Sequence, residues 1–378
     1  SAGERMERVG KWNVIFDKQK SHLAPHLGNL GPIAGLVNAL WFRHGQPMVR
    51  AFLLALVALL APCLAAAEQI EFPAPGGEAD ELRIYSTLDA PLARPLIEAF
   101  QSLYPQTRIL YEDLLSGEIA ARVVAETDSG QGTADFAFSS AMDAQVKLAN
   151  DGYAAALRLP GGADWPRWAN WRDMAYALTF EPGVLVYHKP SFPAGPPRTR
   201  RELMEWLRHG GKGSEGRIGT YDVERSAVGY LFLARDGEHF ADIWSLIAMM
   251  GAAGLQTFPT SQDIIDRVAD GRLALGYNIL GSYAADQART RPDLGMVLLT
   301  DYTVVVSRVA LVPRAARNPE KGAAFLSFLM SRQGQEILSE RLRLPAISLE
   351  VAGENSAQAM EQALGDSLRP VPVSPGLL

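Results

Sequence analysis

The chain has 378 residues, with 36 Lys and Arg, 42 Asp and Glu, a formal net charge of −6 and a single Cys. At roughly 100–200 residues per domain, this length predicts about two domains, and the composition is that of a globular protein. The mildly acidic balance argues against a general nucleic-acid binder, and one cysteine excludes an internal disulfide and a Cys-rich zinc site.

The segment 48–67 has the order of parts that is typical of a secretory signal peptide. Arg50 gives a basic start, residues 51–61 form an apolar run, and small residues at 65–67 supply a cleavage pattern. The apolar run is short for a membrane span, which needs ~20 apolar residues. We therefore expect cleavage after Ala67, with an uncleaved anchor or a buried core helix as the alternatives.

Residues 1–47 fit poorly upstream of such a signal, because Met48 stands where a start is expected. We interpret them as a non-native or mis-assigned extension, with a genuine cytoplasmic extension as the alternative. Cys63 follows a proline, which fits a lipoprotein signal poorly, and cleavage would remove it. The removed segment holds 7 basic and 3 acidic residues, so 68–378 would carry 29 basic and 39 acidic residues, a net charge of −10. An acidic chain without cysteine needs no disulfide in an oxidising compartment, which predicts the periplasm.

Strands and helices alternate along the first part of the mature chain. Residues 68–80, rich in Pro, Gly and Glu, predict a mobile mature N-terminus. We then expect strands at 82–86, 108–111 and 134–138, helices at 91–103 and 119–126, and a helix opening at 139–143. This alternation predicts a mainly parallel sheet covered by helices on both faces.

Three tryptophans, Trp165, Trp168 and Trp171, recur at every third residue. They could form a ligand platform, but such a group more often packs a loop against a core. Beyond them, 176–188 holds two β-rich runs around Glu181, which predict a strand that crosses between two domains.

A second α/β region follows. We expect strands at 217–221, 273–277 and 297–299, and helices at 202–208, 226–233, 243–250 and 264–269. The apolar run 303–312 predicts a strand that crosses back to the first region. A single long helix is expected to open at Asn318 and Pro319, with Gly334 inside it before Ile337 and Leu338. The polar and then Pro-rich tail is expected to lie over the surface.

The chain shows none of several short motifs that carry hydrolytic chemistry. It has no G-x-S-x-G nucleophile elbow, no H-E-x-x-H helix and no P-loop. Only His188, His209 and His239 follow the expected cleavage site. We therefore predict a protein that is not an enzyme and that needs no metal and no cofactor.

Short polar motifs stand instead at the strand-to-helix junctions, where hydroxyl groups meet free backbone N–H groups. They are Ser86 with Thr87, Ser116 with Gly117, Ser139 with Ser140, and Ser226. Helix N-termini bind anions, and ligands of open α/β sheets sit at the carboxyl ends of the strands. Plain N-capping explains any one of these serines. Their recurrence in two α/β regions favours an anion site in a cleft between them.

Several runs also resemble, in their order and spacing, a known family. They are LRIYSTLD (82–89), FQSLYP (100–105), RVVAE (122–126), ADFAFSS (134–140), KLANDGY (147–153) and KGAAFLSFLMSRQGQ (321–335). Together they resemble the periplasmic solute-binding proteins of ABC importers, in the branch of ferric-ion, hexose-phosphate and phosphoglycerate binders. The resemblance implies an α/β, two-lobed type II periplasmic binding protein fold, in which two crossing hinge strands join the lobes and ligand closes the cleft. It places lobe one at 81–180 plus 303–345, lobe two at 183–300, and a C-terminal segment at 346–378.

The resemblance and the junctions together select a set of ligand-binding positions. They are Ser86, Thr87, Ser116, Gly117, Ser139, Ser140, Asp143, Tyr221, Asp222, Arg225, Ser226, Tyr277, Asn278, Tyr283, Asp301 and Tyr302. Hydroxyl and amide groups would orient an anion, Arg225 would pair with it in a bidentate way, and Tyr277 or Tyr302 would contact its carbon skeleton. Core packing of Tyr277, and helix capping by Asp143 and Asp222, are the alternatives.

The predicted function is that of a periplasmic receptor, a monomer, which delivers a small phosphorylated or carboxylated anion to an ABC permease in the inner membrane. One alternative is a sensory subunit read by a histidine kinase, which the fold does not separate from import. Another is a ferric-ion-binding protein. Relatives of that kind carry adjacent tyrosines, whereas Tyr277 and Tyr283 stand apart. No nucleic-acid partner is expected.

Overall fold

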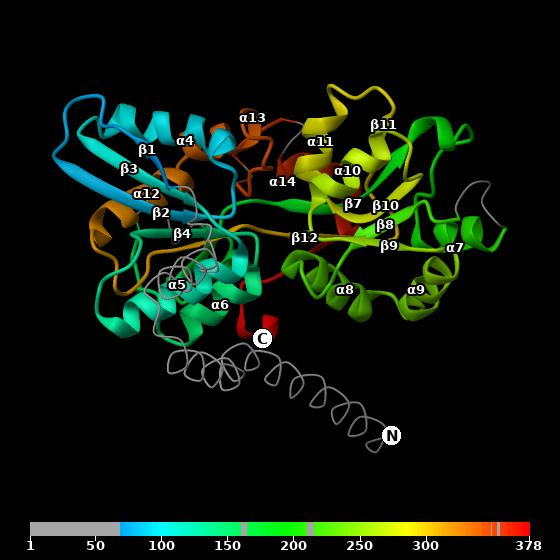
Figure 1. The fold of residues 1–378 in the computed structure, drawn as a ribbon, viewed down its shortest axis with the longest axis horizontal. Helices are drawn as coiled ribbons and strands as arrows, with labels where there is room; N and C mark the ends of the chain where they lie inside the picture. The colour runs from blue at the N-terminus through cyan, green and yellow to red at the C-terminus, as the bar shows by residue number, and fades with distance from the viewer. Residues whose placement is uncertain (1–68, 160–164, 210–214, 349, 354–355) are drawn as a thin grey trace, which may run out of the picture. The chain divides into compact units, whose positions relative to one another are not determined.

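The computed structural model describes residues 69–378, except 160–164, 210–214, 349 and 354–355. The signal peptide predicted at 48–67 and the extension 1–47 lie outside the described residues. Within the described part, 11 α-helices and two β-sheets form two lobes (Figure 1), and none of these helices has the length and apolar character of a membrane span.

The first lobe is built on a seven-stranded sheet in the order β1-β3-β2-β4-β13-β6-β5. Its strands are β1 (Gln69–Phe72), β2 (Asp80–Ser86), β3 (Thr107–Asp113), β4 (Phe136–Ser139), β5 (Asn170–Trp171), β6 (Ala175–Ala177) and β13 (Val309–Leu311). The helices are α4 (Ala90–Leu103), α5 (Ser116–Ser129), α6 (Met142–Asn150), α12 (Pro319–Met330) and α13 (Arg332–Glu340). One layer holds α4, α12 and α13 and the other holds α5 and α6, so helices cover both faces of the sheet (Figure 1).

The second lobe has a sheet in the order β14-β12-β7-β10-β8-β9, with β11 also paired to β7. Its strands are β7 (Glu181–His188), β8 (Ile218–Tyr221), β9 (Gln256–Phe258), β10 (Leu275–Leu280), β11 (Leu294–Val297), β12 (Thr303–Val306) and β14 (Leu368–Pro370). The helices are α7 (Arg200–Arg208), α8 (Ala227–His239), α9 (Ile243–Ala252), α10 (Ser261–Ala269), α11 (Gly281–Ala288) and α14 (Ala357–Leu364).

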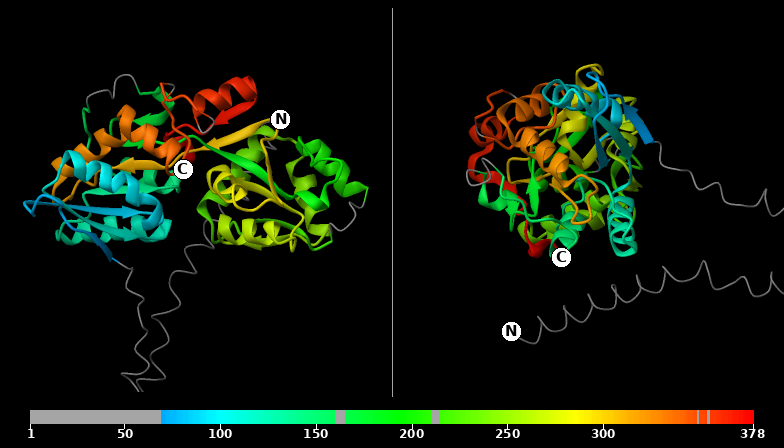
Figure 2. Two further views of the ribbon diagram at one scale, coloured as in Figure 1. Left: turned by 90° about the horizontal axis from the view of Figure 1, so that it is seen from above. Right: turned by 90° about the vertical axis from the view of Figure 1, so that its left-hand side faces the viewer.

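Two segments carry the chain between the sheets. Residues 178–180 join β6 to β7, and residues 307–308 join β12 to β13; both passages can be followed in the left view of Figure 2. The two-lobed α/β fold with two crossing strands, predicted from the sequence, is confirmed. The expectation of a mainly parallel sheet holds for the β2, β3 and β4 group, for the β8, β9 and β10 group, and for the pair β12 and β14. In contrast, β7 and β13 pair antiparallel with β10 and β4, because each enters its sheet from the other lobe.

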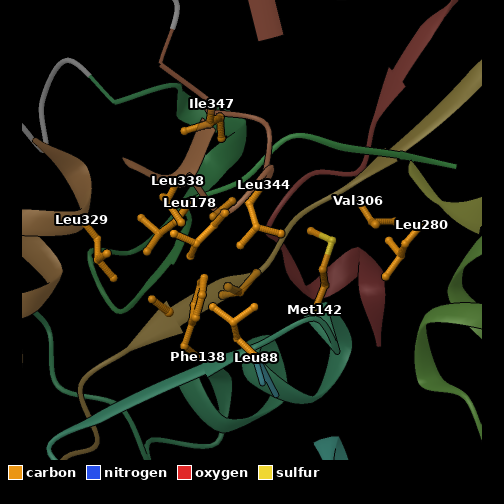
Figure 3. Packing of buried hydrophobic residues seen from close by; sticks show 14 of the residues in the cluster. Leu88, Phe138, Met142, Leu178, Leu280, Val306, Leu329, Leu338, Leu344 and Ile347 are labelled. Atoms are coloured by element: carbon orange, nitrogen blue, oxygen red, sulfur yellow. The ribbon is translucent and has the colours of Figure 1, made fainter. Parts of the chain in front are cut away.

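Apolar side chains fix the backbone where the first crossing segment leaves the first lobe. Leu178 is fully buried among Phe138, Leu338 and Leu344, which come from β4, α13 and the loop after it (Figure 3). Burial of each such side chain contributes about 1.5–3 kcal/mol. The start of the crossing is therefore held by the core of the lobe and not by loop contacts alone.

The prediction of a single long helix from Pro319, with Gly334 inside it, is wrong, because α12 and α13 are separate helices that meet at Ser331. Ser331 has extended backbone, and its hydroxyl accepts the Gly334 N–H at 3.2 Å as the N-cap of α13. A Cβ at Gly334 would lie 2.1 Å from the carbonyl oxygen of Phe328. Only glycine allows this close approach. Gly334, which was predicted to lie in the interior of one helix, therefore lies in the first turn of a second helix.

Both ends of the described chain are more ordered than the sequence suggested. Instead of a mobile terminus, Gln69–Phe72 forms β1, which pairs antiparallel with β3 and buries Phe72. At the other end, β14 pairs with β12 of the second sheet.

The last residues return to the first lobe. The Val373 N–H donates to the Trp168 carbonyl at 2.7 Å, and the final turn, Pro375–Leu377, packs on α6. Arg235 of α8 donates to the Gly376 carbonyl at 3.3 Å. The tail, expected to lie over the surface, is thus a third connection between the lobes.

Candidate binding site at the crossing segments

Arg308, on the second crossing segment, contacts polar groups of both lobes. Its Nη1 lies 3.3 Å from the Thr87 hydroxyl, and its Nη2 lies 3.3 Å from the Tyr283 hydroxyl. Thr87 follows β2 in the first lobe, whereas Tyr283 lies in the first turn of α11 in the second lobe. Because the guanidinium is only 1% exposed, these contacts fix where its donors point.

Glu181, the first residue of β7, neutralises this arginine and ties the two crossings together. Its Oε1 lies 3.2 Å from Arg308 Nε and accepts the Thr179 hydroxyl at 2.9 Å, and its Oε2 accepts the Ser282 hydroxyl at 2.5 Å. The Arg308 Nε–H is not aligned with any acceptor, so charge attraction and not a hydrogen bond holds the pair. Burial lowers the pKa of Arg308, but the Glu181 carboxylate, together with Tyr283 and Tyr111, holds that pKa above its usual value. The guanidinium therefore stays charged.

The first-lobe side of the site is a set of hydroxyl groups at the ends of β2 and β4. Thr87 accepts the Ser140 backbone N–H at 3.1 Å, and both residues are partly exposed. Ser86 and Ser139 are buried, and their hydroxyls accept the N–H groups of Leu88 and Ala141. Thr87 and Ser140 are thus the members of the two predicted pairs that a solute can reach.

Tyr283 supplies a neutral hydroxyl from the second lobe. Burial raises its pKa; Arg308 opposes this shift, while the charges of Asp89 and Glu181 add to it. The phenol stays protonated, accepts from Arg308, and keeps its own hydrogen free to donate to a ligand. Burial also raises the pKa of Asp113, with the charge of Asp89 adding to the shift.

Three further predicted residues lie at the starts of first-lobe helices. Ser116 and Gly117 open α5, where the Glu118 carboxylate accepts the Leu115 N–H at 2.9 Å. Asp143 lies in the first turn of α6; burial raises its pKa, and its Oδ1 has no hydrogen-bond partner among the described residues. Their contact with a ligand stays a prediction.

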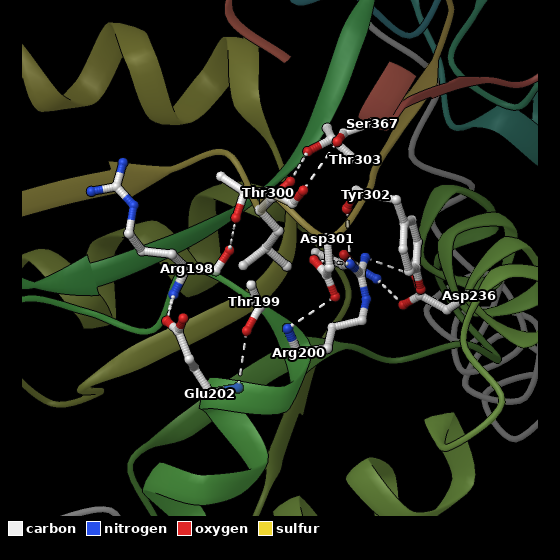
Figure 4. Close-up of polar contacts among 12 residues, drawn as sticks. Arg198, Thr199, Arg200, Glu202, Asp236, Thr300, Asp301, Tyr302, Thr303 and Ser367 are labelled. Carbon is white, nitrogen blue, oxygen red and sulfur yellow. Dashed lines mark hydrogen bonds and ion pairs between the residues drawn. The ribbon is translucent and has the colours of Figure 1, made fainter. Parts of the chain in front are cut away.

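Four other predicted residues, Tyr277, Asn278, Asp301 and Tyr302, belong to a network inside the second lobe. Figure 4 shows Asp301 and Tyr302 of this set beside Arg200 and Asp236. The centre of the network is Asp236 of α8, which is 0% exposed. Its Oδ1 accepts from Arg200 Nη2 at 2.9 Å and from the Tyr302 hydroxyl at 2.7 Å. Its Oδ2 accepts from the Tyr277 hydroxyl at 2.7 Å and from Asn278 Nδ2 at 2.6 Å. All four of these donors are thereby turned toward Asp236 and not toward Arg308.

Arg200 completes the network and brings in the partly exposed Asp301. Its Nη1 donates to Asp301 at 3.1 Å and to the Tyr302 carbonyl at 2.9 Å, and its guanidinium lies 3.5 Å from the centre of the Tyr302 ring. Burial raises the pKa of Tyr277, and the Asp236 carboxylate adds to this shift. The network therefore holds one cation, two carboxylates and two neutral phenols.

The remaining predicted residues surround the start of α8. Tyr221 is buried and shares a 2.6 Å hydrogen bond with the Ser261 hydroxyl, and Asp222 accepts the Glu224 N–H. Ser226 caps α8, since its hydroxyl accepts the Gly229 N–H at 3.3 Å. Arg225 is exposed. The structure thus brings Thr87, Ser140 and Tyr283 together around Arg308, and places these four residues elsewhere.

Sequence reasoning did not select Arg308 or Glu181 as site residues. A usable signal was present, because each is a lone charge inside an otherwise apolar crossing run. Charges are almost never fully buried unless they are paired, so two such residues in the two predicted crossings indicate a buried pair at the hinge. Among the described residues, no group of three or more His, Cys, Asp and Glu side chains is placed to hold a metal ion.

A family model described as bacterial extracellular solute-binding protein matches residues 96–363. A solved structure of the substrate-binding protein of an ABC transporter from Agrobacterium tumefaciens is 58% identical to the chain. The alignment covers 82% of this chain and 93% of that one, with a TM-score of 0.78. No curated protein sequence matches.

More distant structures share the fold. The periplasmic binding protein P5PA is 16% identical, with a TM-score of 0.64, over 78% of this chain and 93% of its own. AfuA from Actinobacillus pleuropneumoniae, solved with fructose-6-phosphate bound, is 17% identical, with a TM-score of 0.59, over 71% of this chain and 84% of its own. Iron-bound HitA from Pseudomonas aeruginosa is 17% identical, with a TM-score of 0.55, over 76% of this chain and 100% of its own.

Proposed function

The chain belongs to the bacterial extracellular solute-binding proteins, which serve ABC transporters and are not enzymes, and we propose that its solute is a small anion. In this proposal a phosphorylated or carboxylated metabolite binds between the lobes, the cleft closes over it, and the loaded monomer docks on an inner-membrane permease. The observation that carries the proposal is the buried Arg308 guanidinium, which faces Thr87 of one lobe and Tyr283 of the other.

The donors around Arg308 suit an oxyanion. A guanidinium presents a planar fork that matches carboxylate and phosphate oxygens, and such charge-assisted hydrogen bonds contribute about 1.5–3 kcal/mol each. Thr87, Ser140 and Tyr283 add neutral donors, which fix orientation without adding charge. The 3.3 Å contacts of Arg308 are long for hydrogen bonds, so an anion accepting at shorter distance would replace them.

Placing the cation on a crossing segment would couple binding to cleft closure. Arg308 and Glu181 lie on the two passages between the lobes, and Glu181 also holds α11 through Ser282. A ligand that draws Arg308, Thr87 and Tyr283 together therefore acts on the hinge itself. Hinge closure around ligand is a known response of two-domain binding proteins.

The solute screen is the direct test of the anion class. We expect a set of sugar phosphates, phosphoglycerates, and di- and tricarboxylates to contain a compound that raises the midpoint of thermal unfolding. Ligand at 100 times its Kd stabilises the native state by about 2.7 kcal/mol, which is readily measured. A thermal shift with ferric ion alone would instead support the iron alternative, as in the iron-bound relative.

Export is tested separately, by the N-terminus of the protein recovered from cells. The order of basic, apolar and small residues at 48–67 predicts cleavage after Ala67. Mass spectrometry of periplasmic extract should find a chain that begins at Glu68. Recovery of the protein only in the cytoplasm, with 48–67 still attached, would contradict the periplasmic assignment.

A further inference from the structure

A second cationic site lies in the first lobe and includes no residue of the crossing segments. A cavity of about 480 Å³ is lined by Arg158, Arg167, Arg172, Asn170, Asp173 and Trp165, among others. This volume is within the range of small-ligand pockets, about 300–1,000 Å³. None of these residues belongs to the cluster around Arg308.

The three guanidinium groups of the cavity have no carboxylate partner in the described part of the chain. The acid in the cavity lining, Asp173, accepts from Asn170 Nδ2 at 2.8 Å and from the Tyr176 hydroxyl at 3.4 Å. Arg172 lies 4.8 Å from the centre of the Trp171 ring, a contact that leaves its charge in place. Three positive charges thus converge on one concave surface of an otherwise acidic protein.

These residues lie on and beside a tight turn that joins the antiparallel strands β5 and β6. Arg172 and Asp173 have φ values of +52° and +56°, as in the favoured two-residue hairpin turn, and the Met174 N–H closes it by donating to the Trp171 carbonyl at 2.9 Å. The turn is held because the Asp173 N–H donates to Asn170 Oδ1 at 3.0 Å and the Leu157 N–H donates to the Asp173 carbonyl at 2.7 Å. The hairpin turn therefore directs the chain along the cavity.

The tryptophans of the same segment fasten it from the inside, in agreement with the packing role expected from the sequence. Trp165 is buried and donates to the Ala177 carbonyl at 2.9 Å, and Trp168 meets Phe180 edge to face at 6.0 Å. The segment thus anchors apolar rings in the lobe and turns arginines toward the cavity. An arrangement built only for packing needs no cluster of like charges, which repel one another.

We propose that this cavity binds a phosphate group. Three guanidinium forks can pair with the several oxygens of a dianion, and the mixed walls of Trp165 and Asn170 leave room for the remainder of a phosphate ester. The bound group comes either from free phosphate or from the headgroup of an anionic phospholipid. The site is independent of the solute cleft, because no residue is shared.

Orthophosphate is the first probe, used with the whole mature chain. We expect isothermal titration to show saturable binding that Arg158→Gln, Arg167→Gln and Arg172→Gln together weaken by about 1,000-fold, about tenfold for each lost guanidinium. Arg201→Gln is the matched control, since it removes an equally exposed arginine of α7 in the other lobe. Thermal unfolding of every variant checks that the lobe is folded.

Vesicles separate the two sources of the phosphate group. Co-sedimentation with phosphatidylglycerol vesicles but not phosphatidylcholine vesicles, lost in the triple variant, assigns the site to lipid headgroups. Orthophosphate binding without vesicle binding assigns it to free phosphate or its small esters. The proposal is overturned if neither probe binds, or if the triple variant binds both as the Arg201→Gln control does. The solute found in the cleft screen should bind the triple variant normally, so failure of one proposal is distinct from failure of the other.

Discussion

Replacing Arg308 with Gln, together with Glu181→Gln, is expected to lower the affinity for the cleft solute by at least 100-fold. The double change removes the guanidinium without leaving an unpaired buried carboxylate, which would itself destabilise the hinge. Two charge-assisted hydrogen bonds at about 1.5–3 kcal/mol each account for a loss of this size. The measurement is isothermal titration with the compound identified by the thermal-shift screen.

Two further variants give this result its meaning. Arg314→Gln removes an exposed arginine a few residues along the same chain segment and should leave affinity unchanged. Arg308→Lys keeps the positive charge but lacks the two Nη groups that reach Thr87 and Tyr283. Its affinity for the solute should therefore lie between those of wild type and the double variant. If the folded double variant binds within threefold of wild type, Arg308 does not hold the solute.

The second large effect is expected at Asp236, in the interior of the second lobe. Asp236→Ala should lower the free energy of unfolding by about 3–5 kcal/mol, the usual cost of breaking a buried ion pair from one side. The substitution leaves the buried Arg200 without its closest carboxylate and removes the acceptor of Tyr277, Asn278 and Tyr302. Urea denaturation followed by circular dichroism measures the change, and hydrogen exchange should place it in β10 and α8.

Asp301→Asn is the matched control for this prediction. Asp301 pairs with the same Arg200, but its side chain is 24% exposed against 0% for Asp236. Partly exposed pairs contribute about 0–1 kcal/mol, so this variant should be nearly as stable as wild type. Equal losses from the two substitutions would show that burial of the pair is not what matters. Arg200→Met combined with Asp236→Leu should regain much of the loss, because no charge is then buried alone.

Individual strands and helices could be predicted where the spacing of apolar residues and the length of the segment both indicate the same type of element. The strand predicted at 82–86 and the helix predicted at 91–103 differ from β2 and α4 by at most two residues at either end. The sequence did not reveal the break at Ser331, because Ser and Gly are both tolerated inside helices and the close approach of Gly334 to Phe328 is tertiary. Similarly, β1 is only four residues long, too short for its alternation to stand out.

The site was predicted less well, for a physical reason. Position at a strand end places a residue at the correct edge of its sheet, and this brought Thr87 and Ser140 to Arg308. Position alone does not tell whether a side chain faces the cleft or the core. Tyr277 was predicted to end its strand but lies inside β10, and it hydrogen-bonds to Asp236, which precedes it by 41 residues. No local sequence pattern predicts such a long-range pairing.

The third connection between the lobes matters for anyone who wishes to immobilise this receptor or build a sensor from it. β14 belongs to the second-lobe sheet, whereas the turn at Pro375–Leu377 packs on α6 of the first lobe. A reporter fused to the C-terminus, or a surface attached there, is therefore connected to both lobes. Such a fusion would restrain the movement of one lobe relative to the other. Attachment through a cysteine that replaces Trp244, which is 63% exposed on α9, would involve the second lobe only and leave the first lobe free to move.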